Sequence, residues 1–254
     1  MAMAELEGKR ALVTGGAQGL GKAIATLFVE RGARVMVSDI DEGGAKLTAD
    51  ELGESAQAVR CDVTSLAEHQ AAVQATVNAF GGLDILVNNA GIEVVKPLFH
   101  HTEQEFDAIY NINVKGVWLG MQAALAALPQ PGGVIVNMAS LAGLGGVPLF
   151  GAYSASKAGV VQLTRAAATE LKPTGIRVNA VCPAFIATAM VDRLKPIVTE
   201  IVGVPFDDLA AMKQGRVGTP EEVAEMVAFL ASDDSSFCTG GAYVLDGGLQ
   251  AGML

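Results

Sequence analysis

Ala11-Leu12-Val13-Thr14-Gly15-Gly16-Ala17-Gln18-Gly19-Leu20-Gly21 is the stretch of sequence that decides the fold. A short apolar run enters a glycine-rich loop, and residues 22–31 then carry apolar side chains at helical spacing until Gly32. The glycines therefore lie at a strand-to-helix turn, where the backbone can approach a ligand closely. A helix that begins there presents free N–H groups to phosphate.

The next apolar run, 34–39, ends in Asp39. It lies about 20 residues beyond the glycines, where the Rossmann fingerprint places a carboxylate that binds ribose hydroxyls. The glycine spacing (Gly15, Gly19, Gly21) differs from the Gly-x-Gly-x-x-Gly of that fingerprint. Many glycine loops are ordinary tight turns, but strand, loop, helix, strand and terminal Asp together favour dinucleotide binding.

The same alternation continues along the chain. Further strands are expected at 58–63, 84–87, 133–140, 176–181 and 242–245, and helices at 65–80, 103–128, 151–171 and 221–230. This pattern predicts an α/β fold, a single-domain Rossmann-type doubly wound parallel sheet with helices on both faces, over residues 1–254. Ligands of such sheets bind beyond the carboxyl ends of the strands. Residues that follow strands should therefore converge on one edge: the glycine loop, Asp39, Asp62, Asn89, Ser140 and Pro183.

Composition and charge exclude several functions. The 254 residues are 51% hydrophobic and carry a net charge of −10, which argues against nucleic-acid or anionic-membrane partners. Residues 1–10 lack the apolar region of a signal peptide. Three cysteines without a CxxC pair favour neither a disulfide framework nor a zinc site, and indicate a reducing cytoplasm. His69, His100 and His101 lack a ligand-like arrangement, so we expect no metal.

Tyr153 and Lys157 are four positions apart and would lie on one face of a helix. The free pKa of tyrosine is ~10. A lysine cation about 4 Å away favours the phenolate by roughly 4 kcal/mol at a dielectric of ~20. We therefore expect Lys157 to lower the pKa of Tyr153 toward the pH at which general acid–base catalysis works best. The pentapeptide 153–157 alone fits an incidental surface pair at least as well.

Several motifs together resemble the classical, single-domain type of the short-chain dehydrogenase/reductase family. They cover essentially the whole chain: TGGAQGLG (14–21), NNAG (88–91), Asn113 within NINVKG, Ser140, YSASK (153–157) and RVNAVCP (177–183). The resemblance implies NAD(P)-dependent oxidation of an alcohol, or reduction of a ketone.

The resemblance also implies roles for four residues. Tyr153 would be the catalytic acid–base, and Ser140 would hydrogen-bond the substrate oxygen. Lys157 would hold the nicotinamide ribose and lower the Tyr153 pKa. Asn113 would interrupt its helix and hold a water that links Lys157 to solvent; a solvent-facing asparagine is the alternative.

Cofactor choice can be argued from charge. Asp39 would accept hydrogen bonds from the ribose hydroxyls of NAD and repel the 2′-phosphate of NADP. No Lys or Arg lies in 14–21, and Ile40 follows Asp39, so we expect NAD to be preferred. Ala184 replaces the glycine that commonly follows Pro183 in the family. Expected cofactor contacts are Gly15, Gln18, Gly19, Leu20, Gly21, Asp39, Ile40, Asp62, Val63, Asn89, Ala90, Gly91, Tyr153, Lys157, Pro183, Ile186 and Thr188.

Residues 185–214 are rich in apolar side chains and are expected to form a lid over the substrate. We expect a hydrophobic secondary alcohol or ketone, such as a steroid or another alicyclic, held by Ser140, Leu141, Phe150, Tyr153, Phe185 and Met190. Alternatives are a lid whose apolar residues pack on its own domain or on a neighbour, 3-oxoacyl-carrier-protein reduction, sugar or polyol oxidation, and a non-catalytic nucleotide-binding protein. The resemblance further implies a homo-oligomer, commonly a tetramer, built on two long helices and the C-terminal strand.

Overall fold

The computed structural model describes residues 5–252. Within them, seven strands form one parallel sheet in the order β3-β2-β1-β4-β5-β6-β7. The order reverses at β1, so the crevice between β1 and β4 is the switch point at which such sheets bind ligands. The predicted fold class is therefore confirmed. The strands are β1 (Arg10–Thr14), β2 (Arg34–Asp39), β3 (Ala56–Arg60), β4 (Ile85–Asn88), β5 (Val134–Met138), β6 (Arg177–Pro183) and β7 (Ala242–Leu245).

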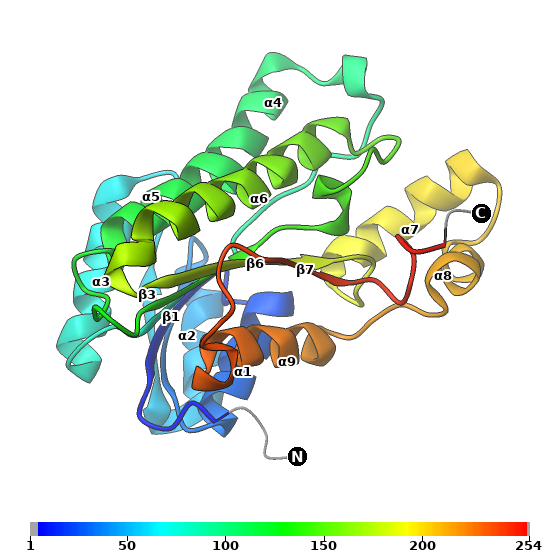
Figure 1. Cartoon of the computed structure of the whole chain (residues 1–254). Helices are drawn as coiled ribbons and strands as arrows, with labels where there is room; N and C mark the ends of the chain where they lie inside the picture. The colour runs from blue at the N-terminus through cyan, green and yellow to red at the C-terminus, as the bar shows by residue number, and fades with distance from the viewer. Residues whose placement is uncertain (1–4, 253–254) are drawn as a thin grey trace.

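Helices cover both faces of the sheet (Figure 1). One face carries α1 (Gly19–Glu30), α2 (Glu42–Leu52) and α9 (Pro220–Ala231), and the other carries α3 (Leu66–Phe80), α5 (Gly116–Ala124) and α6 (Gly151–Leu171). Each face has its own apolar core, because side chains of a strand alternate between the two sides. Val13 packs with α1 and α9, for example, whereas its neighbour Leu12 packs with α3 and α5.

The helix expected over 103–128 is broken and ends earlier. It consists of α4 (Glu103–Tyr110), a π-helical turn (Asn111–Lys115) and α5, which ends at Ala124. Thr102 and Glu105 form a capping box that starts α4. The interruption at Asn113 was expected, but the early end was not: residues 125–127 form a turn that leads toward Pro129.

Two other expectations need correction. The third strand spans Ala56–Arg60 rather than 58–63, so Asp62 and Val63 lie in the loop after it. Helix α2 was not expected, because its apolar periodicity is weak. It forms because Asp41 caps it by accepting a hydrogen bond from the N–H of Gly44 and because Ala45, Thr48 and Ala49 are buried.

The segment 185–214 forms two helices, α7 (Ala189–Val202) and α8 (Phe206–Gln214), beyond the carboxyl end of β6 (Figure 1). Their buried side chains, including Val191, Leu194 and Phe206, pack with Phe150 in a third, smaller apolar cluster. Part of the apolar surface of segment 185–214 thus packs on its own domain, which was one of the alternatives to a substrate lid. Other apolar side chains remain exposed: Ile197, Ile201, Val202 and Met212.

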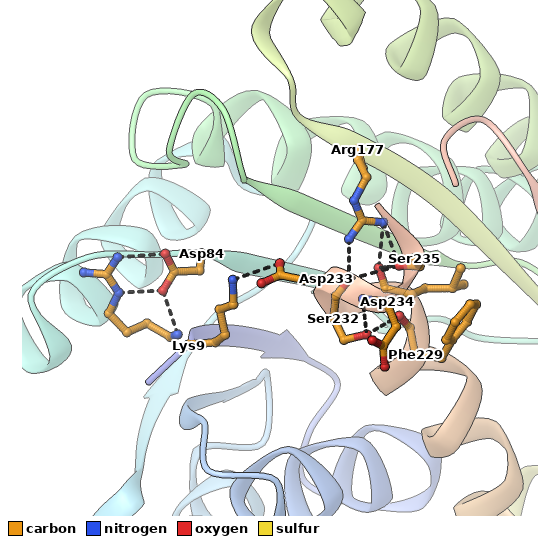
Figure 2. A network of polar contacts seen from close by, with 10 residues as sticks. Lys9, Asp84, Arg177, Phe229, Ser232, Asp233, Asp234 and Ser235 are labelled. Carbon is orange, nitrogen blue, oxygen red and sulfur yellow. Dashed lines mark hydrogen bonds and ion pairs between the residues drawn. The ribbon is translucent and has the colours of Figure 1, made fainter. Parts of the chain in front are cut away.

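The amino ends of the strands are joined by polar contacts (Figure 2). Asp84, just before β4, accepts hydrogen bonds from the Nε and Nη2 atoms of Arg10 at 2.6 and 2.7 Å. Arg177, the first residue of β6, donates to Ser235 and to the carbonyls of Leu230 and Ser232.

No helix among residues 5–252 is long and apolar enough to cross a membrane.

Candidate active site

A cleft of about 310 Å³ opens at the carboxyl ends of the strands. It contains most of the residues predicted to bind the cofactor, although they come from six separate segments of the chain. Lining residues that were predicted are Gly15, Gln18, Gly19, Leu20, Asp39, Ile40, Asp62, Val63, Asn89, Ala90, Gly91, Tyr153, Lys157 and Thr188.

The glycine loop fits the phosphates of a dinucleotide. Gly15 and Gly19 have φ of 67° and 56°, a left-handed conformation that glycine adopts without strain. Gln18, the N-cap residue of α1, makes no capping hydrogen bond with its side chain. The first N–H groups of this helix therefore face the cleft without a capping side chain, as phosphate binding requires.

Two acidic residues, Asp39 and Asp62, line the cleft. Asp39 accepts hydrogen bonds from the N–H groups of Ala17 and Asp41, each at 3.0 Å, which fixes its carboxylate at the end of β2. Asp62 accepts from the N–H and hydroxyl of Thr64, and these hydrogen bonds lower the pKa of its carboxyl. The carboxylate of Asp39 retains free lone pairs for ribose hydroxyls.

Some predicted cofactor residues support the cleft from behind. Gly21 is buried, and a Cβ atom there would lie 2.0 Å from the Gly15 carbonyl oxygen. The Asn89 side chain, although it lines the cleft, donates to the carbonyls of Thr14 and Gly15 at 2.9 and 3.0 Å. Pro183 and Ile186 are also buried, and neither lines this cleft, so their expected contact with the cofactor stays a prediction.

Tyr153 and Lys157 lie on one face of α6, as expected, and the Lys157 ammonium is 5.7 Å from the centre of the Tyr153 ring. The ammonium donates a hydrogen bond to the Met138 carbonyl at 2.8 Å. Ser140, which follows β5, accepts from the N–H of Ala142 and donates to the Pro183 carbonyl, and it lies close enough to Tyr153 to affect the pKa of the phenol. The three side chains therefore meet where the cofactor cleft joins a second cavity.

The expected effect of Lys157 on the Tyr153 pKa is wrong for this structure. Burial raises the pKa of Tyr153 to about 12, while its hydrogen bond with Ser140 acts in the opposite direction. Burial also lowers the pKa of Lys157 to about 8. Lys157 does not lower the Tyr153 pKa as expected because its ammonium donates to the Met138 carbonyl and is itself buried, which disfavours its charged form.

Asn113 lies in the π-helical turn and is fully buried, which excludes the solvent-facing alternative. Its Oδ1 accepts from the N–H of Ile92 at 2.9 Å. Its Nδ2 donates to the Ile92 carbonyl at 2.9 Å and to Ser156 at 3.0 Å. The side chain therefore fastens the loop after β4 to α6, one residue away from Lys157.

The second cavity, of about 680 Å³, lies under α7 and α8 and is lined mainly by apolar side chains. Ala184, which stands where the family commonly has glycine, does not distort the wall of this cavity. Its N–H donates to the Leu245 carbonyl, and its φ is not positive, because Leu149 is the one non-glycine residue among 5–252 with a positive φ. All six predicted substrate residues line this cavity: Ser140, Leu141, Phe150, Tyr153, Phe185 and Met190.

The sequence reasoning missed two charged residues. Glu93 lines the substrate cavity, and Arg193 of α7 lines the cofactor cleft. Their side chains form an ion pair at 3.2 Å. Glu93 lies five residues after the end of β4, so the rule applied to other residues beyond strand ends could have found it. Residues 5–252 hold no group of three or more His, Cys, Asp or Glu suited to a metal ion.

Comparisons with known proteins agree with this geometry. A family model described as enoyl-(acyl carrier protein) reductase matches residues 15–250. The chain is 41% identical to a 3-alpha-(or 20-beta)-hydroxysteroid dehydrogenase of Mycobacterium bovis over 98% of its own length and 92% of that protein's. It is 40% identical to a 3-oxoacyl-(acyl-carrier-protein) reductase of Thermotoga maritima, over 96% and 98% of the two chains.

A solved structure has the same fold. It is a short-chain dehydrogenase/reductase, a glucose/ribitol dehydrogenase, from Brucella melitensis. Its TM-score is 0.90 and its identity 33%, over 98% of this chain and 99% of that one. The chain thus belongs to the short-chain dehydrogenase/reductase family, as an oxidoreductase of alcohol and ketone groups.

Proposed function

We propose that this protein interconverts a hydrophobic secondary alcohol and its ketone with NAD. The observation that carries the proposal is the largely apolar cavity of about 680 Å³, which is lined by Ser140 and shares Tyr153 and Met190 with the dinucleotide cleft. A substrate in this cavity would bury its carbon frame against Leu141, Phe150 and Phe185 while its oxygen reaches the polar pair.

The residues of the site divide the reaction between them. Bound NAD would supply the hydride acceptor. In the oxidation direction Tyr153 acts as the phenolate, which takes the hydroxyl proton of the alcohol and becomes the phenol; in the reduction the phenol returns that proton to the ketone oxygen. The Ser140 hydroxyl donates to the same oxygen as negative charge develops on it. Lys157 binds the nicotinamide ribose. A buried ammonium with a single carbonyl partner has donors left for that purpose.

Asn113 is a positioning residue in this proposal. Its hydrogen bonds with Ile92 and Ser156 keep the loop after β4 and the start of α6 at a constant separation. A water held near this turn would connect Lys157 to solvent, as the family resemblance implies. Asn113→Ala should therefore lower turnover more than it lowers affinity for NAD.

NAD is proposed over NADP because of the Asp39 carboxylate at the end of the cleft. The loop 14–21 carries no cation that would neutralise a 2′-phosphate, and Ile40 is exposed beside it. Burying a phosphate dianion next to a carboxylate is unfavourable unless a cation pairs with it.

The relatives leave the substrate class open between steroids, carrier-bound acyl groups and sugars or polyols. The apolar cavity favours the first over the third. An acidic carrier protein needs a basic docking surface, which a net charge of −10 does not favour. A non-catalytic nucleotide-binding role is disfavoured because Ser140, Tyr153 and Lys157 are all present and adjacent.

A substrate panel tests the proposal. Initial rates with NAD should be highest for alicyclic and steroid secondary alcohols, and low for glucose, ribitol and other polar polyols. Preference for glucose, ribitol or other polar polyols over alicyclic alcohols, or for NADP over NAD, would contradict it. The same panel in reverse, with NADH and 3-oxoacyl thioesters, measures the carrier-protein alternative.

We further propose a homotetramer in the cytoplasm. The exposed aromatic side chains of Phe106 and Trp118 on α4 and α5, and of Phe237 before β7, would be covered by neighbouring subunits. The three cysteines are unpaired thiols, which suits a reducing compartment. Light scattering on the purified protein measures the subunit number directly.

A further inference from the structure

Glu93 places a carboxylate in the wall of the substrate cavity. The residue lies in the loop between β4 and α4, and its side chain is only 8% exposed. It shares the cavity with Ser140 and Tyr153, and most of the remaining wall is apolar. A nearly buried carboxylate in such a wall is unfavourable unless its oxygens are satisfied.

Among residues 5–252, only one of the two oxygens of this carboxylate has a hydrogen-bond partner. Oε1 accepts a hydrogen bond from Nη2 of Arg193 at 3.2 Å. The contacts among residues 5–252 give Oε2 no donor. Because Glu93 lines this cavity and its Oε1 is paired with Arg193, Oε2 is available there as a hydrogen-bond acceptor.

The other charged and titratable groups of the region do not provide that donor. The Arg193 side chain is 63% exposed and is directed to Oε1. Lys213 lines the cavity from α8 but is exposed, so water solvates its ammonium. Tyr153 lies close enough to Ser140 for the two side chains to interact. The negative charge of Glu93 contributes to raising the Tyr153 pKa, which indicates that Glu93 and Tyr153 are within electrostatic reach.

We propose that Glu93 determines substrate specificity by accepting, at Oε2, a hydrogen bond from a second hydroxyl group of the substrate. The preferred substrate is then a diol or hydroxy ketone on an otherwise apolar carbon frame. A plain alcohol displaces water from Oε2 without replacing its hydrogen bond, and so binds less well. This inference rests on the proposed function and narrows its substrate class.

The test compares cyclohexanol with 1,2-, 1,3- and 1,4-cyclohexanediol as substrates, with NAD. A hydrogen bond to a buried carboxylate should make kcat/KM for the best diol, per carbinol, about ten to one hundred times that for cyclohexanol. Glu93→Leu should bring this ratio close to one. Glu93→Gln, which keeps an acceptor but no charge, should give an intermediate ratio and shows the effect if the leucine variant does not fold.

Glu105→Gln is the matched control. Glu105 is also ion-paired, with Lys96 at 2.6 Å, but it does not line the cavity, so its substitution should leave the ratio unchanged. Equal rates for diols and cyclohexanol in the unaltered protein, or a ratio that Glu93→Leu and Glu93→Gln do not lower, would overturn the inference while the proposed oxidoreductase function stands. Absence of NAD-dependent turnover of every alcohol tested would overturn both.

Discussion

The two edges of the sheet treat charged groups in opposite ways. At the amino edge, Arg177 donates to Ser235 and to the carbonyls of Leu230 and Ser232 (Figure 2), and also to the carbonyl of Cys238. Asp84 accepts three hydrogen bonds from Arg10. At the carboxyl edge, Lys157 has one carbonyl partner and Glu93 has one cation. Charges at the first edge are satisfied within the protein and stabilise it, whereas those at the second retain hydrogen-bonding capacity for ligands.

The sharpest test of this difference is Tyr153→Phe at the carboxyl edge. Removing the phenol hydroxyl should lower kcat about a thousandfold, because proton transfer by a positioned side chain contributes on this scale. The affinity for NAD and the melting temperature should change little. Rates and NAD titration of the same preparation provide the measurement, and unchanged turnover would exclude Tyr153 as the acid–base.

The buried Lys157 should make stability depend on pH at the same edge. Its pKa in the folded protein is about 8, below the ordinary 10.5, so between these values the unfolded chain binds more protons. Stability should therefore rise with pH from 8 to 10, by up to roughly 3 kcal/mol at 1.36 kcal/mol per pH unit. Urea denaturation without NAD measures this slope.

The slope should disappear in Lys157→Met. Lys172→Met is the control, because Lys172 lies exposed just beyond the end of α6 and its loss should leave the slope as it is. A stability that falls between pH 8 and 10 in the unaltered protein would contradict the lowered pKa of Lys157.

At the amino edge, Asp84→Ala should affect stability and not activity. Burial alone would raise the pKa of Asp84, but the hydrogen bonds from Arg10 outweigh it and lower this pKa. The substitution should cost about 2 kcal/mol, since it leaves a part-buried guanidinium without its carboxylate. Denaturation and kcat are the two measurements; a kcat reduced tenfold would show that the edges are not independent.

The pair of Arg10 and Asp84 also predicts how the stability of the protein responds to acid. A carboxyl whose folded pKa is lowered stabilises the protein above its unfolded pKa, and this contribution is lost as pH falls through the folded value. Unaltered protein should therefore lose more stability than Asp84→Ala when the pH is lowered from 5 to 3.

The smallest effect is expected for cofactor choice. Asp39→Ser should lower the ratio of kcat/KM for NAD to that for NADP by about tenfold, because it removes one charged hydrogen-bond acceptor and one repulsive charge. Asp41→Ser is the matched control: Asp41 caps α2, does not line the cleft, and serine can also cap a helix. An unchanged ratio in Asp39→Ser would remove the basis for the NAD preference.

The sequence by itself determined the sheet, most of the residues that line the cleft, and the three residues to which our proposal gives catalytic roles. The position of a strand such as β2, a single apolar run between charged ends, follows from the local sequence pattern. Residues that follow different strands meet because the carboxyl ends of parallel strands lie at the same edge of the sheet. Ser140, Tyr153 and Lys157 therefore converge as predicted.

Only the tertiary structure decided the direction of the pKa shifts and the presence of a partly paired carboxylate, Glu93, in the wall of the second cavity. Burial, which depends on the packing of every neighbouring element, outweighs the local charge of Lys157 at Tyr153. The partial pairing of Glu93 likewise depends on Arg193, one hundred residues away on α7, and no local pattern specifies that contact.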